Sequence, residues 1–410
     1  MMYNMRRGDN MLVRENYLAR IRGFYNSDLI KILVGIRRCG KSVILNQIVD
    51  ELKEKNKVDD EHIIFINFEF IEFEDLLDYK KLNTYIKDRI KDNKMYYLFL
   101  DEVQNVDNFE RVVNSLRASI KNISIFLTGS NSKMLSDELS SVLSGRYVLF
   151  NINPLSYKEF VQLTDKNGQD LDTFWDYAKW GGLPNRCEFI NEIDIKNYLH
   201  SVYDSIILRD VVKRLNLKDT VLFDMILQYL IETAGREFSA ENVIKYLMNE
   251  NKKISNETLY NYIDALCKAL IIKKVYRYDV AGKSVLKTLN KYYATDLGIA
   301  QIKNNNPEFK SYIVLENVVY NELLNRGYDV YIGKTKTGEV DFLAKKDGNT
   351  KYIQVTYEMN SEETIDREFG AYKGVDDNYP KYVISLDKIN LSRDGIIHLN
   401  LIDFLLSNDF

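Results

Sequence analysis

The segment Gly35-Ile36-Arg37-Arg38-Cys39-Gly40-Lys41-Ser42 has the residue types and spacing of a phosphate-binding loop. In such a loop, glycines let backbone N–H groups turn toward phosphate oxygens, and the following helix adds its N-terminal dipole. The lysine reaches the β and γ phosphates, and the hydroxyl holds Mg²⁺. We therefore expect this segment, together with Val43, to bind ATP, with Lys41 also acting in catalysis and Ser42 as a ligand of Mg²⁺.

A second chemical element is the pair Asp101-Glu102, which follows the apolar run Tyr96-Tyr97-Leu98-Phe99-Leu100. Two carboxylates at the tip of a strand can simply begin a loop or cap a helix. Downstream of a phosphate-binding loop, the same pair predicts hydrolysis: Asp101 would hold Mg²⁺ through water, and Glu102 would act as the general base toward the attacking water.

Further residues could complete the reaction site. Ser130 or Asn131 follows the next apolar run and could hold the attacking water beside the γ-phosphate, although a plain turn explains them as well. Phosphoryl transfer also needs positive charge. Arg146, which lies just past the last core strand, is our first candidate; weaker candidates are Arg111, Arg117, Arg186 and Arg209.

Three residues inside the loop have other possible roles. Arg37 and Arg38 are expected to face outward, or to contact the nucleotide or a neighbouring domain. Cys39 would place a thiol at the nucleotide site, which predicts alkylation without ATP and protection with it.

Alternating strands and helices must position these groups. Short apolar runs without polar alternation indicate strands of a parallel sheet that is covered on both faces, and helical patterns separate them. The expected strands are 30–34, 62–68, 96–100, 123–128 and 147–150, and the expected helices are 41–55, 74–91 and 107–120.

The remainder of the chain changes character twice. Aromatic-rich helices extend from Pro154 to about residue 215, interrupted by a turn at 181–184. Helices 220–234, 239–249 and 256–270 then precede two strand-like pieces, 271–278 and 285–293, which is the order of a winged helix. From about residue 308, a helix at 311–326 and several strands predict a separate α/β unit: the strands are 328–333, 338–344, 351–357 and 381–385, with a further helix near 361–373.

Composition narrows the function classes. The net charge of −4 argues against a surface that coats DNA non-specifically, although one basic face remains compatible with it. The three cysteines are far apart, so neither a disulfide framework nor a cysteine zinc site is expected. No apolar stretch predicts a signal peptide or a membrane span. These features predict a cytoplasmic protein.

Several strings resemble a known family. KILVGIRRCGKS, LFLDEVQN, LTGSNSKML, LSGRYV and NPLSYKEF resemble the AAA-like ATPases of bacteria and archaea that are known as ATP-binding proteins. GGLPN, RGYDVYIGK, GEVDFLA and YIQVTYEM resemble the C-terminal domain of that family, whose function is unknown. The resemblance implies a P-loop AAA-like ATPase core at 1–152, a helical lid at 153–215, a winged helix at 216–298 and a small α/β restriction-endonuclease-like domain at 299–410.

Nucleases of the PD-(D/E)xK type use carboxylates to hold Mg²⁺ and a lysine to orient water. In this chain Glu316 and Asp341 stand in the matching positions, but Gln354 replaces the second metal-binding carboxylate and Thr356 replaces the lysine. We therefore expect the tail to be a degenerate nuclease site, unless Lys373 or Arg367 supplies the missing charge.

The winged helix leaves two partner classes open. The polar positions of helix 256–270 (Asn256, Thr258, Tyr260, Asn261 and Lys268) and the wing residues Lys273, Lys274, Arg277, Lys283 and Lys287 are compatible with phosphate contacts. Winged helices also bind proteins. The sequence thus predicts an ATPase that acts on DNA or on a DNA-bound partner. Two alternatives remain: a slow ATP switch that recruits a protein partner or self-associates, and an ATP-regulated nuclease.

Overall fold

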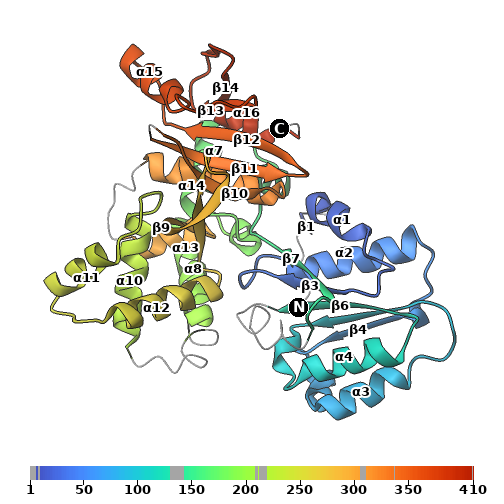
Figure 1. Cartoon of the computed structure of the whole chain (residues 1–410). Coiled ribbons are helices and arrows are strands. Elements are labelled where there is room, and N and C mark those ends of the chain that lie inside the picture. The colour runs from blue at the N-terminus through green and yellow to red at the C-terminus, as the bar shows by residue number, and fades with distance from the viewer. Residues whose placement is uncertain are drawn as a thin grey trace. The chain divides into compact units, whose positions relative to one another are not determined.

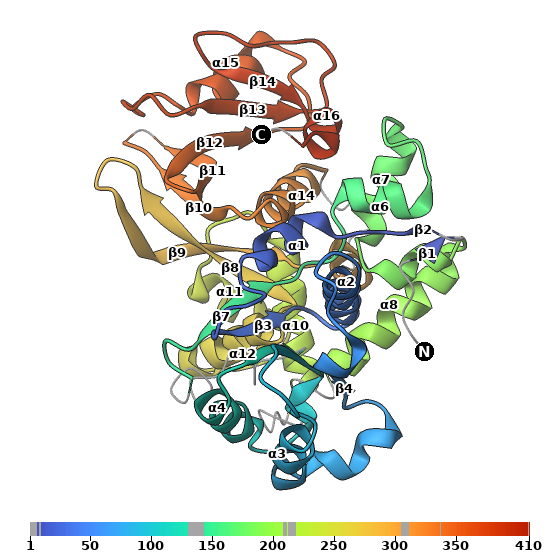
Figure 2. The same cartoon turned by 90° about the vertical axis from the view of Figure 1, so that its right-hand side faces the viewer.

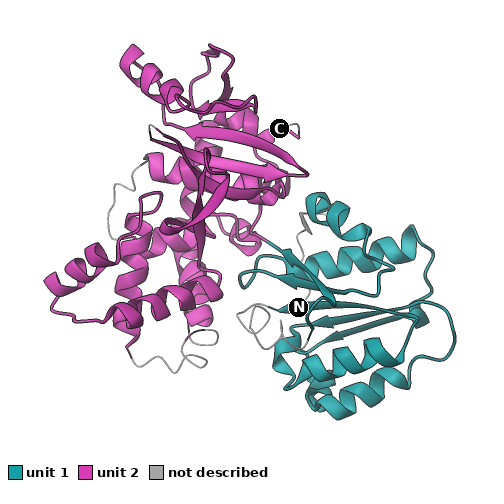
Figure 3. Ribbon diagram, viewed as in Figure 1, with its two compact units in different colours: residues 1–152 teal, residues 153–410 magenta. Residues whose placement is uncertain are grey.

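The computed structural model describes residues 6–7, 10–129, 143–207, 211, 219–304, 311–336, 338–408 and 410. The chain divides into two compact units, residues 1–152 and 153–410, rather than into four parts (Figure 3). None of the described helices is long and apolar enough to cross a lipid bilayer.

The first unit contains a parallel sheet of five strands in the order β4-β5-β6-β3-β7. Its central strands are buried along their whole length, which explains why they read as continuous apolar runs. The strands are β3 (Ile30–Val34), β4 (Ile63–Asn67), β5 (Tyr96–Asp101), β6 (Ile123–Gly129) and β7 (Tyr147–Asn151), and a short pair, β1 (Arg6–Arg7) and β2 (Asn10–Met11), precedes them.

Helices cover both faces of this sheet. In Figure 1, α1 (Glu15–Arg22) and α2 (Lys41–Glu54) lie on one face, and α3 (Tyr79–Lys87) and α4 (Phe109–Ser119) lie on the other. The core on the α3–α4 face is built from aliphatic side chains of the strands and from one apolar stripe of each helix. Because all five strands are parallel, their carboxyl ends meet at one edge, where the phosphate-binding loop and Asp101 lie.

The second unit begins with helices and continues with a sheet of seven strands. The order is β14-β13-β12-β11-β10-β8-β9. The helices are α6 (Tyr157–Thr164), α7 (Leu171–Trp180), α8 (Glu192–Ile206), α10 (Thr220–Glu232), α11 (Ala240–Asn249), α12 (Asn256–Lys268), α13 (Leu297–Lys303), α14 (Ser311–Asn325), α15 (Glu362–Gly370) and α16 (Leu401–Leu406). The strands are β8 (Ile272–Asp279), β9 (Ser284–Ala294), β10 (Asp329–Lys334), β11 (Glu339–Lys346), β12 (Asn349–Val355), β13 (Lys381–Ser385) and β14 (Ile397–Asn400).

The wing and the C-terminal strands form one sheet, so the expectation of a separate tail is wrong. The hairpin β8–β9 joins the tail because β8 pairs in parallel with β10, with Arg277 opposite Ile332. Figure 2 shows the other end of the same sheet, where β12, β13 and β14 lie side by side. Paired strand edges satisfy backbone groups that would otherwise be exposed, which gives a physical reason for the fusion.

Candidate functional site

The phosphate-binding loop links β3 to α2 and needs glycine at two places. A Cβ atom at position 35 would lie 2.2 Å from the carbonyl oxygen of Ile152, so no side chain fits there. Gly40 has φ 101°, a left-handed conformation that L side chains rarely adopt. The spacing of the glycines therefore follows from the backbone path as well as from the ligand.

Lys41 begins α2 and is 4% exposed. Its Nζ donates to the carbonyl oxygens of Gly35 and Ile36, at 3.1 and 3.3 Å, which places the ammonium over the loop. Ser42 and Val43 belong to the same first helical turn. The loop thus presents a lysine, a hydroxyl and a helix N-terminus together, the set that suits a bound phosphate.

Asp101 ends β5 and is fully buried. Its carboxylate accepts from the hydroxyl of Thr128 on β6 and from Nδ2 of Asn67 on β4, the latter at 3.0 Å. Burial raises the pKa of Asp101 to about 6, while hydrogen bonds from Thr128 and from Ser42 oppose that rise. A carboxylate bonded to the hydroxyl of the phosphate-binding loop suits Mg²⁺, which Asp101 and Ser42 would hold together.

Glu102 follows directly and adopts a left-handed conformation with φ 53°. Its backbone N–H donates to Oγ1 of Thr128 at 2.9 Å, and its carboxylate accepts from Nε2 of Gln104. Thr128 therefore bridges the two acidic residues. Sequence reasoning did not single out Asn67 or this bridge, although a polar residue at the end of β4 follows the same rule that identified Asp101.

The expected sensor and arginine residues are only partly placed. Ser130, Asn131 and Arg209 lie outside the described residues. Arg146 does not lie beside the phosphate-binding loop, contrary to the prediction. It precedes Tyr147, which pairs with Ile30 at the start of β3, and the loop follows the other end of that strand. The separation along the strand is about 13 Å.

Arg146 and two of the weaker candidates are held by side chains of their own compact unit. Arg146 donates from Nη1 to Asn114 of α4 at 2.8 Å. Arg117 pairs with Asp28 and Arg186 pairs with Asp176. Within the loop, Arg38 is exposed, and Nη1 of Arg37 lies 3.9 Å from Glu69.

Cys39 does not offer the accessible thiol that the sequence suggested. Its side chain is fully buried, and Sγ donates to the carbonyl oxygen of Ile152 at 3.3 Å. Burial raises the pKa of this thiol, which lowers its reactivity. Nη1 of the fully buried Arg14 also supports the loop, because it donates to the Cys39 carbonyl at 3.1 Å.

A second cluster of charged groups lies in the second unit, around Glu316 of α14 and Asp341 of β11. Burial, followed by the nearby carboxylate of Glu316, raises the pKa of Asp341 well above its ordinary value. The hydroxyl of Tyr293 donates to Glu316. A Cβ atom placed on Gly235 would approach Oε2 of Glu316 to 2.6 Å, so the carboxylate packs tightly against that turn.

Lys291 of β9 supplies a positive charge to this cluster. Its Nζ lies 2.5 Å from Glu339 and 3.6 Å from Glu316. Burial alone would lower the pKa of Lys291, but the carboxylates of Glu316, Asp341 and Glu339 together hold it above its ordinary value. Sequence reasoning missed Lys291 because it belongs to the wing strand and reaches the tail only through the pairing of β8 with β10.

The remaining predicted tail residues are held by hydrogen bonds. Oε1 of Gln354 accepts from the backbone N–H of Asp341 at 3.2 Å, and Nε2 donates to Glu368 of α15 at 3.1 Å. Arg367 pairs with Glu368 at 2.7 Å. Thr356 lies just beyond β12, and its backbone N–H donates to the Ile384 carbonyl. The amide of Gln354 thus joins Asp341 to Glu368.

The surface predicted to contact DNA is less basic than expected. The exposed positions of α12 include Glu257 and Asp264, and Lys268 pairs with Asp264 at 2.8 Å. In the wing, Arg277 is buried and its Nη2 lies 3.3 Å from Glu237. The wing lysines that are exposed are Lys274, Lys283 and Lys287.

Comparison with known proteins places this geometry in a family. Residues 27–161 match the AAA domain, and residues 171–308 match a domain of unknown function, DUF8612. A Walker-type ATPase of Pyrococcus abyssi has a similar fold, with a TM-score of 0.50 and 15% sequence identity over 74% of this chain and 99% of that chain. The first unit is therefore a P-loop ATPase fold.

Full-length relatives are also found. An uncharacterized protein of Haemophilus influenzae is 35% identical over 404 residues, which cover 97% of this chain and 99% of the relative. An uncharacterized protein of Methanocaldococcus jannaschii is 32% identical over 378 residues, which cover 88% of this chain and 81% of the relative. The chain therefore belongs to the family of these proteins, with an AAA domain as its first unit.

Proposed function

We propose that this chain binds Mg-ATP, hydrolyses it, and uses the nucleotide state to drive or switch an action on DNA or on a DNA-bound partner. The observation that carries the proposal is the bridge by Thr128 between Asp101 and Glu102, at the strand edge that bears the phosphate-binding loop. In this proposal Lys41 binds phosphate, Asp101 and Ser42 hold Mg²⁺, and Glu102 accepts the proton of the attacking water.

The hydrolysis claim has a direct test. Purified protein is assayed for phosphate release with Mg-ATP, and nucleotide binding is measured separately by equilibrium dialysis. Glu102→Gln should lower kcat by about 100-fold or more while ATP still binds, because the general base is lost. Lys41→Ala should abolish binding. Turnover of the Glu102→Gln variant at the wild-type rate would refute the assigned base.

The DNA part of the proposal rests on the exposed wing lysines Lys274, Lys283 and Lys287. Their replacement by alanine should weaken binding of duplex DNA in low-salt gel shifts and reduce any stimulation of ATP hydrolysis. The matched control replaces Lys87, Lys91 and Lys94, which are exposed on the first unit. If the wild type neither binds duplex DNA nor hydrolyses ATP faster in its presence, the DNA part of the proposal is refuted and the ATPase part is not.

A slow switch that recruits a protein is the second candidate. It is favoured by the acidic groups Glu257 and Asp264 on the exposed face of α12, where a DNA-reading helix would carry positive charge. It predicts that nucleotide co-purifies with the protein and that turnover is very slow with and without DNA. Fast turnover that DNA stimulates would exclude it.

A further inference from the structure

The carbonyl of Ile152 lies directly against the phosphate-binding loop. The carbonyl oxygen accepts from Sγ of Cys39 at 3.3 Å, and the backbone N–H of Ile152 donates to the Val34 carbonyl at 2.6 Å. The closest approach is to Gly35, where a Cβ atom would lie 2.2 Å from that oxygen. Because interiors are close-packed, a shift of the loop backbone must also move Ile152.

The next residue, Asn153, is the first of the second unit and is fastened there by its side chain. Its Oδ1 accepts from Nζ of Lys273 on β8 at 2.5 Å, and its Nδ2 donates to Oδ1 of Asn325 on α14 at 2.9 Å. Asn153 is 5% exposed. One peptide bond thus joins a group packed on the phosphate-binding loop to a group held by β8 and α14.

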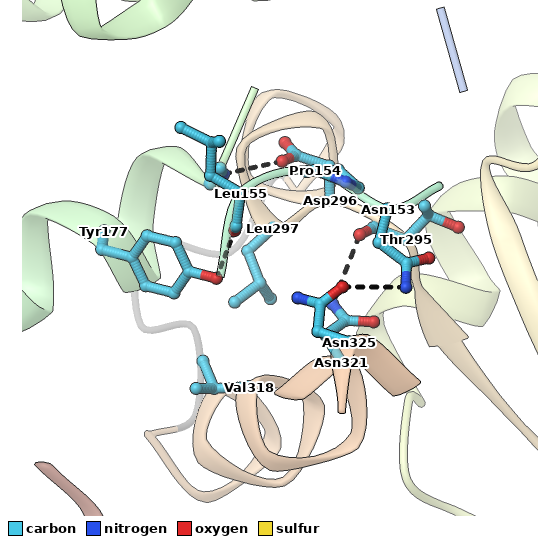
Figure 4. Close-up of a pocket in the computed structure, with 12 residues that line it drawn as sticks. Asn153, Pro154, Leu155, Tyr177, Thr295, Asp296, Leu297, Val318, Asn321 and Asn325 are labelled. Atoms are coloured by element: carbon cyan, nitrogen blue, oxygen red, sulfur yellow. Dashed lines mark hydrogen bonds between the residues drawn. The ribbon is translucent and has the colours of Figure 1, made fainter. Parts of the chain in front are cut away.

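The chain after Asn153 is held as firmly. The N–H of Leu155 donates to the Gly182 carbonyl at 2.8 Å, and the hydroxyl of Tyr177 donates to the Leu155 carbonyl at 2.9 Å. Figure 4 shows these groups around a small pocket. Hydrogen bonds therefore hold the chain on each side of the Ile152–Asn153 peptide bond.

The pocket that Asn153 lines contains two further buried polar atoms. Thr295 Oγ1 and Asn321 Oδ1 line it, are buried, and find no hydrogen-bond partner among the residues that the structure describes. The volume of the pocket is about 10 Å³, which is about the room that one water molecule needs. Buried unpaired oxygens favour any arrangement that gives them a donor, and Asn153 lines the same pocket.

We propose that Asn153 is a positioning residue that couples the nucleotide state of the phosphate-binding loop to β8 and α14. The inference rests on the proposed binding of ATP and names the route by which the nucleotide acts on the second unit. Loop movement reaches Ile152 through Cys39 and Gly35. It then shifts the amide of Asn153 between Asn325 and the acceptors of the pocket, which is the two-state element that coupling requires.

The test is hydrogen–deuterium exchange of the full chain, with and without a non-hydrolysable ATP analogue, read at peptides that cover β8 and α14. In the wild type, the analogue should change their exchange rates by about fivefold. Asn153→Ala should reduce that change below about twofold, although ATP affinity stays within about twofold of the wild type. Asn261→Ala, on the exposed face of α12, is the matched control and should behave as the wild type.

A conservative variant separates coupling from simple loss of structure. Asn153→Asp keeps an acceptor for Lys273 and, after rotation of the Asn325 amide, an acceptor for that group as well, so the second unit should stay packed. Its carboxylate has no N–H to donate to the pocket oxygens, so the nucleotide-dependent change should still fall below about twofold. Wild-type protein that binds the analogue with no change at β8 and α14 would overturn the inference alone, as would an Asn153→Ala variant with the full change. No binding of the analogue by the wild type would overturn the proposed function and the inference together.

Discussion

Lys291 of β9 and Glu316 of α14 form a buried ion pair, with 3.6 Å between Nζ and Oε1. The same ammonium lies 2.5 Å from Glu339. A single ammonium therefore faces several carboxylates, and it ties the wing hairpin to the C-terminal strands.

Replacing Lys291 with methionine should destabilise the chain by about 3 kcal/mol, because it leaves buried carboxylates without their cation. Urea unfolding followed by circular dichroism measures the change. Adding Glu316→Gln should recover part of the loss, since the two residues interact directly. The matched control is Lys334→Met, an exposed lysine on β10, which should shift stability by less than about 0.5 kcal/mol. Equal effects of the two lysine variants would contradict a structural role for the pair.

The cluster around Asp341 should not cut DNA. Glu316 is buried, Asp341 is half-buried, and both already interact with the Lys291 ammonium, so they are poorly placed to hold Mg²⁺ beside a phosphodiester. Supercoiled plasmid incubated with protein and Mg²⁺ or Mn²⁺ should remain intact. Nicking that disappears in an Asp341→Ala variant would show that the site is active.

Thr128 should matter for hydrolysis more than for folding. Thr128→Val removes the hydroxyl that bonds Asp101 and the N–H of Glu102 while it keeps the side-chain shape, and kcat should fall by about tenfold or more. Thr128→Ser retains the hydroxyl and serves as the control. Phosphate release gives the rates, and thermal melting shows whether both variants stay folded. Equal kcat for the two variants would mean that the bridge is not needed for turnover.

Lys31 of β3 should make stability depend on pH. Burial lowers the pKa of Lys31 to about 7, far below the value of about 10.5 that it recovers on unfolding. Between those values the unfolded chain binds more protons, so stability should rise with pH, by about 2 kcal/mol from pH 7 to pH 9 for this residue. In urea titrations, the free energy of unfolding of the wild type minus that of Lys31→Met should therefore increase from pH 7 to pH 9. A constant difference would place the ammonium in a wetter site.

Local pattern was enough to predict most of the first unit. The expected strand 30–34 coincides with β3, and the helix expected at 41–55 is α2, because both are continuous apolar or periodic segments beside a glycine signal. The sequence favours Arg146 because its position along the chain is evident locally, whereas the direction of the neighbouring strand within the sheet is not. Parallel pairing puts the residue before β7 at the edge away from the phosphates.

The second unit was harder to predict because its key contacts are non-local. The strands β8 and β10 were each expected, but nothing in either segment indicates that Arg277 pairs opposite Ile332. Lys291 and Asn153 could not be identified from the sequence for the same reason. Neither a lysine in a tyrosine-rich strand nor an asparagine before a proline indicates by its local sequence which residue it will contact. Their partners, Glu316 and Asn325, are set only by tertiary packing.

The pairing of β8 with β10 also has a consequence for biosynthesis. The two strands are separated in the chain by β9, α13 and α14. During translation, the edge of β8 therefore stays unpaired until β10 has emerged, and non-local pairing of this kind forms slowly. An unpaired strand edge can pair with another chain, so the interval between synthesis of the hairpin and arrival of β10 is when aggregation is most favoured and when a chaperone would be most useful.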